Sequence, residues 1–183
     1  MGAPAEEVIF AGAVEGLFIK GLGSRVTLEL QAELRAVGLD LSKELLPAYP
    51  RKVWNAALPL AVQHVWPQLD VAEGHYRLGR AIIDGFKETL LGRALAGMAR
   101  VLGPMRTLGR MRQNLRTGAN YNEITLTPQS ANEVLFWINE PFIHPGYVQG
   151  LLHGSMEICG TRNSKVEVVS KDEAGTTYRV RWD

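Results

Sequence analysis

The side chains best suited to chemistry in this sequence are arginines. Positions 89–122 contain six of them and no lysine, aspartate or glutamate. They are Arg93, Arg100, Arg106, Arg110, Arg112 and Arg116. A guanidinium is planar, permanently charged and able to bind carboxylate or phosphate in a bidentate manner. The segment is therefore either a solvated helix face, a site for an anion or acidic partner, or a nucleic-acid surface. We do not expect nucleic acid, because interleaved aromatic residues are missing.

The histidines and the cysteine give little indication of a metal or catalytic site. The chain has four histidines and one cysteine, and the histidines show neither HxH nor HxxxH spacing, so we predict no metal site. His144 lies at a hairpin-to-helix junction and His153 lies on the helix that follows. We interpret both as packed or capping side chains, with a shared pocket as the alternative. Motifs for a nucleophile elbow, a P-loop or a dinucleotide site are absent, so we do not expect an enzyme.

Composition limits the class of protein. The chain of 183 residues is 46% hydrophobic and 21% charged, with a formal net charge of +1, which predicts one globular domain over 1–183. A single cysteine is typical of a reducing compartment, so we expect a cytoplasmic protein. The N-terminal stretch lacks the basic region of a signal peptide, and no apolar run reaches the ~18 residues of a membrane span.

The first half of the chain is predicted to be helical after one short strand. The strand lies within 6–18, and helices follow over 27–38, closed by Gly38, and over 51–65, ended by Pro67. Leu28, Leu30, Leu34 and Val37 are the expected buried side of the first helix. Pro59 is expected to bend or break the second.

The arginines belong to a long helical tract over 71–118. Joints at Gly85 and at Gly103-Pro104 divide it into three helices. The second helix, 87–101, is apolar nearly all round, which predicts a buried central helix. On the third, Met105, Leu108, Met111 and Leu115 share one side, while the arginines lie at its margin or point away.

The last third alternates strands with one helix. Residues 120–140 and 164–182 each predict a hairpin, and 144–160 predict a helix that begins at Pro145. Glycines recur every four residues at 146, 150 and 154, which indicates close packing on a sheet, with a dimer seam as the alternative. Together these elements predict an α+β fold, a helical layer packed on a mainly antiparallel twisted sheet.

Two resemblances extend this interpretation. The segments "LLPAYP", "YRLGR", "ETLLGR", "RVLGPMRTLGRMRQNLRTGANY" and "GLLHGSMEICG" resemble a myxobacterial paralogous family of uncharacterised proteins over nearly the whole chain. The segment 145–182 resembles the fold shared by haem nitric-oxide-binding domains, four-vinyl-reductase domains and TRAPP vesicle-tethering subunits. The second resemblance implies a small molecule held between helices and sheet, or a dimeric scaffold.

The resemblance also allows haem to be tested against the residues. The haem domains use a proximal histidine on a helix ahead of the sheet and a Tyr-x-Ser-x-Arg motif before the final helix. Here "RTLGRMRQNLR" has no histidine and "FWINEPFIHPG" has no such motif. We therefore do not expect haem, and the cofactor stays unknown.

The function we predict is a non-enzymatic, cytoplasmic sensory or adaptor module for a small hydrophobic or anionic ligand. Its pocket would be lined by Trp137, Met98 or Leu115, with an arginine at its mouth. The alternative is a dimeric scaffold that binds an acidic protein partner through the arginine-rich segment. A third reading, a small-molecule enzyme, would need His144 or His153 as its base.

Overall fold

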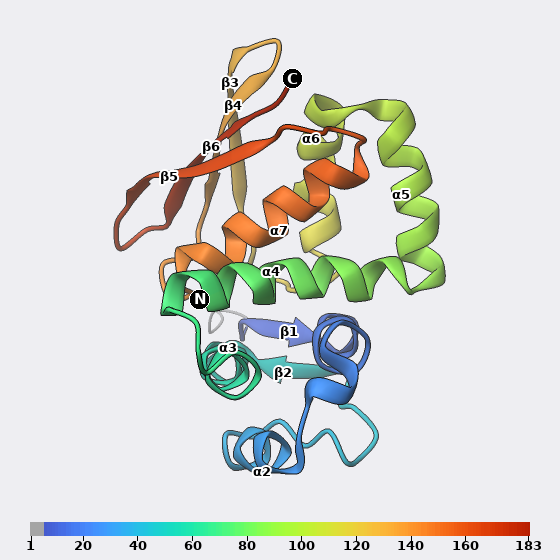
Figure 1. Cartoon of the computed structure of the whole chain (residues 1–183), viewed down its shortest axis with the longest axis vertical. Coiled ribbons are helices and arrows are strands. Elements are labelled where there is room, and N and C mark those ends of the chain that lie inside the picture. The colour runs from blue at the N-terminus through green and yellow to red at the C-terminus, as the bar shows by residue number, and fades with distance from the viewer. Residues whose placement is uncertain (1–5) are drawn as a thin grey trace, which may run out of the picture.

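The computed structural model describes residues 6–183, apart from the side chains of residues 90 and 91. Seven α-helices, two short helices of other types and six strands are present in this part of the chain (Figure 1). In order they are β1 (Val8–Phe10), α1 (Ala11–Val14), the π-helix η1 (Glu15–Leu22), the 3₁₀-helix η2 (Gly23–Arg25), α2 (Leu28–Ala36), β2 (Ala48–Pro50), α3 (Arg51–Val65), α4 (Val71–Lys87), α5 (Leu90–Leu102), α6 (Pro104–Leu115), β3 (Ile124–Ser130), β4 (Glu133–Ile138), α7 (Pro145–Ile158), β5 (Lys165–Lys171) and β6 (Thr176–Arg181). The predicted α+β fold class is confirmed.

The main sheet has the order β3-β4-β6-β5, and all neighbours run antiparallel. Every second residue of the central strands is buried, because side chains alternate between the two faces of a sheet. Phe136 on β4 pairs with Tyr178 on β6, and both are fully buried. This face carries the core, and α7 runs between it and α4 (Figure 1). A separate two-stranded ribbon of β1 and β2 lies beside α3.

Helices α4 and α7 touch backbone to backbone. A Cβ atom added at Gly150 would lie 2.0 Å from the carbonyl oxygen of Tyr76, and one added at Gly79 would lie 1.9 Å from that of Tyr147. The predicted packing of the glycine repeat on a sheet is therefore wrong, since its partner is a helix. Only glycine permits this approach, because any side chain would meet a carbonyl group.

Helix α5 is not the buried central helix that its composition predicts. Val101 is 88% exposed and Met98 is 45% exposed. Helix α4 takes the central place instead, with Leu78 fully buried, while α5 lies at the outer edge of the molecule (Figure 1). The apolar surface of α5 is accounted for in part by a cavity described below.

Most predicted helix ends are confirmed, but the predicted joint at Gly85 is wrong, because α4 continues through this glycine to Lys87 and Gly85 instead packs against the backbone of Gly16 and Gly21. Helix α3 spans 51–65 as expected and continues through Pro59, whose side is exposed. Positive φ angles at Gly38, Gly103 and Gly160 follow α2, α5 and α7. In α2, Leu28 is exposed rather than buried, because it lies in the first turn and away from Leu30 and Leu34, which are buried. Within residues 6–183, no helix is both long and apolar enough to cross a membrane.

Candidate ligand-binding cavity

A cavity of about 380 Å³ lies between the helices and the core face of the sheet. Its wall is mostly apolar and comes from helices α1, η1 and α3 to α7, from strands β1 and β4, and from the loops that follow α6 and β4. Representative members are Trp54, Phe86, Leu95, Met111, Phe136 and Leu151. Both the volume and the apolar character are typical of a small-molecule site.

Helical spacing explains why these side chains converge. Leu151, Ser155 and Ile158 follow one another at intervals of four and three residues on α7, so they share one side of the helix. The same rule places Met111 and Leu115 of α6 on one side. Predicted from the sequence as the apolar side of the third helix, this side of α6 is confirmed as inward facing.

Three buried titratable side chains stand out in the wall of the cavity, besides the partly exposed Glu15. Tyr121 and Tyr147 are buried aromatic residues, and Glu140 is 4% exposed. Burial raises the pKa of both phenols, and the charge of Glu140 raises them further. The two hydroxyls therefore stay protonated near neutral pH and can donate hydrogen bonds. Burial also raises the pKa of Glu140, against the opposing effect of Arg51.

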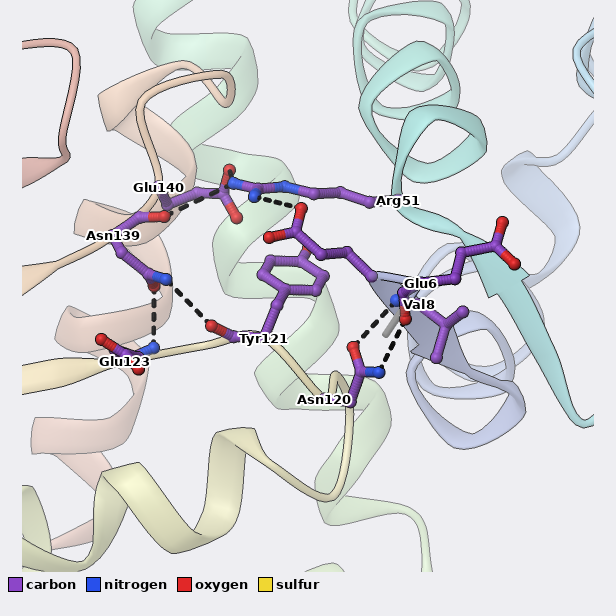
Figure 2. Close-up of polar contacts among 9 residues, drawn as sticks. Glu6, Val8, Arg51, Asn120, Tyr121, Glu123, Asn139 and Glu140 are labelled. Atoms are coloured by element: carbon purple, nitrogen blue, oxygen red, sulfur yellow. Dashed lines mark hydrogen bonds and ion pairs between the residues drawn. The ribbon is translucent and has the colours of Figure 1, made fainter. Parts of the chain in front are cut away.

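Arg51, the first residue of α3, balances the charge of Glu140. Its Nη2 lies 2.6 Å from Oε1 of Glu140, and its Nη1 lies 2.8 Å from Oε2 of Glu7. The guanidinium also lies over the rings of Tyr121 and Phe142, 4.2 and 4.9 Å from their centroids. Although burial opposes the charge, the two carboxylates raise the pKa of Arg51. Arg51 is therefore held charged and is not among the residues that line the cavity. Figure 2 shows its contacts with the carboxylates.

Two asparagines fix the loop that carries Tyr121. Asn139 accepts a hydrogen bond from the backbone N–H of Glu123 at 2.7 Å and donates one to the carbonyl of Tyr121 at 2.9 Å. Asn120 accepts a hydrogen bond from the N–H of Val8 at 2.9 Å. The loop is thereby tied both to β1 and to the end of β4 (Figure 2).

The six predicted arginines lie elsewhere. All are exposed, Arg93 and Arg100 on α5 and the other four on or just after α6. Among the described residues, no carboxylate forms an ion pair with any of them. Arg112 and Arg116, together with Gly109 and Gln113, line a separate depression of about 260 Å³. No arginine lies in the described wall of the main cavity, so the expectation of one at its mouth is not met.

The other predicted site residues are also outside the cavity. Trp137 is half-buried and belongs to the opposite face of β4 from Phe136, because neighbouring strand residues alternate. Met98 is exposed, and of the three predicted lining residues only Leu115 is found in the wall.

His144 and His153 do not share a pocket. The Nδ1 atom of His144 accepts a hydrogen bond from the N–H of Gly146 at 3.1 Å, and its ring packs against that of His75 with centroids 4.8 Å apart. His153 Nδ1 lies 2.5 Å from the hydroxyl of Tyr76. Both are capping or packed residues between α7 and α4, as interpreted from the sequence.

Comparison with known proteins places the chain in a family. A family model described as "Protein of unknown function (DUF2378)" matches residues 7–183. The chain belongs to this family. Among curated proteins, none matches the sequence. The myxobacterial origin and the kinship with four-vinyl-reductase and TRAPP proteins stay predictions.

Solved structures with a similar fold are H-NOX domains. An oxygen-binding H-NOX domain related to soluble guanylate cyclases is 17% identical, with a TM-score of 0.66 over 94% of each chain. An Fe(II) unliganded H-NOX protein from K. algicida is 10% identical, with a TM-score of 0.63 over 94% of this chain and 95% of that one. An H-NOX domain used to probe haem distortion is 19% identical, with a TM-score of 0.66 over 94% of each. The likeness thus extends well beyond the last third, to which the sequence had confined it, and it concerns the fold.

The described wall of the cavity can be compared with what haem needs. Haem iron is held by histidine, cysteine, methionine or tyrosine, and its carboxylates pair well with arginine. The described wall contains Met111, Tyr121 and Tyr147 but no histidine, cysteine, arginine or lysine. In residues 6–183, no three His, Cys, Asp or Glu side chains gather as a metal site. The usual histidine-and-cation set is therefore not provided by these residues, and a haem-free protein stays a prediction.

Proposed function

We propose that this DUF2378-family protein is a non-enzymatic, cytoplasmic sensory or adaptor module that binds a small hydrophobic ligand. The cavity of about 380 Å³ between helices and sheet carries this proposal. A mostly apolar space of this size favours an apolar guest over ordered water, because water needs two to four polar partners. The shared fold with an oxygen-binding H-NOX domain supports a ligand held between these layers.

The arrangement of polar groups favours binding over catalysis. A general base must reach the bound molecule, and the histidines offered by the sequence are engaged outside the cavity. Glu140, which does reach the wall, is neutralised by Arg51. The module therefore holds its ligand without transforming it.

Native mass spectrometry beside the denatured mass tests this function. We expect the purified protein to carry an excess mass that denaturation releases. Ala96 lines the cavity, so Ala96→Phe fills part of it and should reduce this excess mass. Ala94, two residues earlier on α5, is exposed and outside the wall, so Ala94→Phe is the matched control. Equal ligand retention by both variants would show that the ligand does not bind in this cavity.

A second candidate function concerns the arginine-rich segment. We propose that its exposed guanidiniums bind an acidic protein partner, either in the sensor or in a dimeric scaffold. Their lack of ion pairs with the described carboxylates and the neighbouring exposed Met98 and Val101 favour this role. Arg106→Glu with Arg110→Glu should abolish partner capture in a pull-down at an unchanged melting temperature. Arg162→Glu, an exposed arginine outside the segment, should leave capture intact.

A further inference from the structure

The polar groups of the cavity wall determine which chemistry its ligand can carry. Tyr147 is 5% exposed and lines the cavity, and none of the described residues is hydrogen-bonded to its hydroxyl. Tyr121 and Glu140 line the same wall. Arg51 joins these two, since its Nη2 lies 2.6 Å from Oε1 of Glu140 and its guanidinium carbon lies 4.2 Å from the centroid of the Tyr121 ring. Other polar side chains, Glu15 among them, also line the cavity, and we call the buried titratable set of Tyr121, Glu140 and Tyr147 the polar patch.

This polar patch can both donate and accept hydrogen bonds. The phenols are protonated, and because Tyr121 is already hydrogen-bonded to Glu140, it is Tyr147 that offers an O–H donor, while a carboxylate accepts with two oxygens. Only Oε1 of Glu140 is bonded to Arg51. A hydroxyl group on a ligand matches this combination, because it can accept from a phenol and donate to the carboxylate.

Charged head groups fit the polar patch poorly. A ligand carboxylate would face Glu140, and no cation lies in the described wall to offset the repulsion. Arg51 cannot serve instead, because it stands behind the wall with its two Nη atoms bonded to Glu7 and Glu140. A ligand ammonium that approached Glu140 would be repelled by the positive charge of Arg51, whose Nη2 already lies 2.6 Å from Oε1 of Glu140. Both signs of charge would also lose their hydration in an apolar space.

We infer that the ligand of this cavity is an uncharged lipophilic molecule with a hydroxyl group, which binds Tyr147 and Glu140 while its hydrocarbon part fills the apolar space. This inference rests on the proposed function and narrows it, because it sets aside the anionic ligands that the arginine-rich sequence suggests. The arginines lie on the outside and play no part in holding the ligand.

Competition against a fluorescent probe tests the inference on the wild-type chain. The uncharged probe N-phenyl-1-naphthylamine is bound first, and 1-decanol, decanoate and decylammonium then compete for it at neutral pH. These three share one chain length and differ in head-group charge. We expect 1-decanol to displace the probe at a concentration at least tenfold below that of either ion.

One pair of variants locates the head group. Tyr147→Phe removes one hydrogen-bond donor and should weaken 1-decanol about three- to tenfold, with little change in probe affinity. Tyr76→Phe is the matched control, because Tyr76 is bonded to His153 outside the cavity wall. Its affinity for 1-decanol should equal that of the wild type.

The outcomes distinguish failure of the inferred ligand chemistry from failure of the proposed function. If decanoate or decylammonium competes as well as 1-decanol, or if Tyr147→Phe leaves the alcohol unaffected, the inferred chemistry is overturned while ligand binding stands. If the probe does not bind and none of the three compounds protects the protein against thermal unfolding, the proposed function falls as well.

Discussion

Removal of Arg51 should expose how the cavity wall is held. In Arg51→Met, Glu140 keeps its burial and loses its cation. Breaking a buried ion pair from one side costs about 3–5 kcal/mol, because the remaining charge is uncompensated. With a denaturant dependence of about 2 kcal/mol/M, this corresponds to a fall of about 2 M in the midpoint of urea unfolding.

Two further variants make this prediction specific. Arg77→Met breaks the pair with Glu73, which has the same 2.8 Å separation as that between Arg51 and Glu7, but both its side chains are more than 40% exposed. The loss should stay below about 1 kcal/mol. Arg51→Met combined with Glu140→Leu removes both charges and should recover at least half of the stability lost in the single variant.

The pH dependence of the stability lost in Arg51→Met gives an independent test of the ion-pair account. Burial already raises the pKa of Glu140 in the folded protein, and loss of Arg51 raises this pKa further. A carboxyl group with a raised folded pKa binds its proton more tightly when folded, so its penalty grows as pH rises through that pKa. The deficit of Arg51→Met should therefore be smaller at about pH 5 than at about pH 7. Equal losses in Arg51→Met and Arg77→Met, or a deficit that grows on acidification, would refute the ion-pair account.

Two other predictions concern the contact between α4 and α7. Gly150→Ala should lower the free energy of unfolding by about 3 kcal/mol or more in thermal or urea unfolding, because its Cβ would meet the Tyr76 carbonyl. Gly97→Ala has open space around its Cβ and should raise the free energy of unfolding by about 0.5–1 kcal/mol through helix propensity. Similar values for both variants would contradict the backbone contact. Burial lowers the pKa of His75 and of His144, so stability should fall as pH drops through the unfolded histidine value near 6.5. The melting temperature of His75→Phe should fall less over pH 7 to 5, and a pH dependence equal to that of the wild type would show that His75 is not responsible.

Local features of the sequence were sufficient for most of the architecture. Helix α3 begins and ends where its flanking prolines indicate, and the alternation in β6 gives the buried face of Tyr178 and Val180. Such features depend on neighbours in sequence. The prediction that α5 is buried was wrong, because an apolar sequence shows how hydrophobic a helix is but not which elements cover it. Part of α5 faces a cavity rather than packed side chains.

The polar patch and its arginine were missed for a different reason. Arg51 and Glu140 are 89 positions apart, and no local pattern joins them. One signal was available, since the buried alternation Val134, Phe136, Ile138 continues to position 140. Continued by one step, it places a carboxylate on the core face of the sheet, where a cation is required.

The glycine contact between α4 and α7 has a mechanical consequence. Helices that meet through side chains can slide when those side chains change rotamer, but a carbonyl lodged against a Cα has no alternative position to adopt. The part of the cavity wall made by α4 and α7 is therefore expected to be rigid. Any change in cavity volume on filling is therefore expected in α5 and α6, which meet at Gly103 and carry, on or just after them, the six exposed arginines.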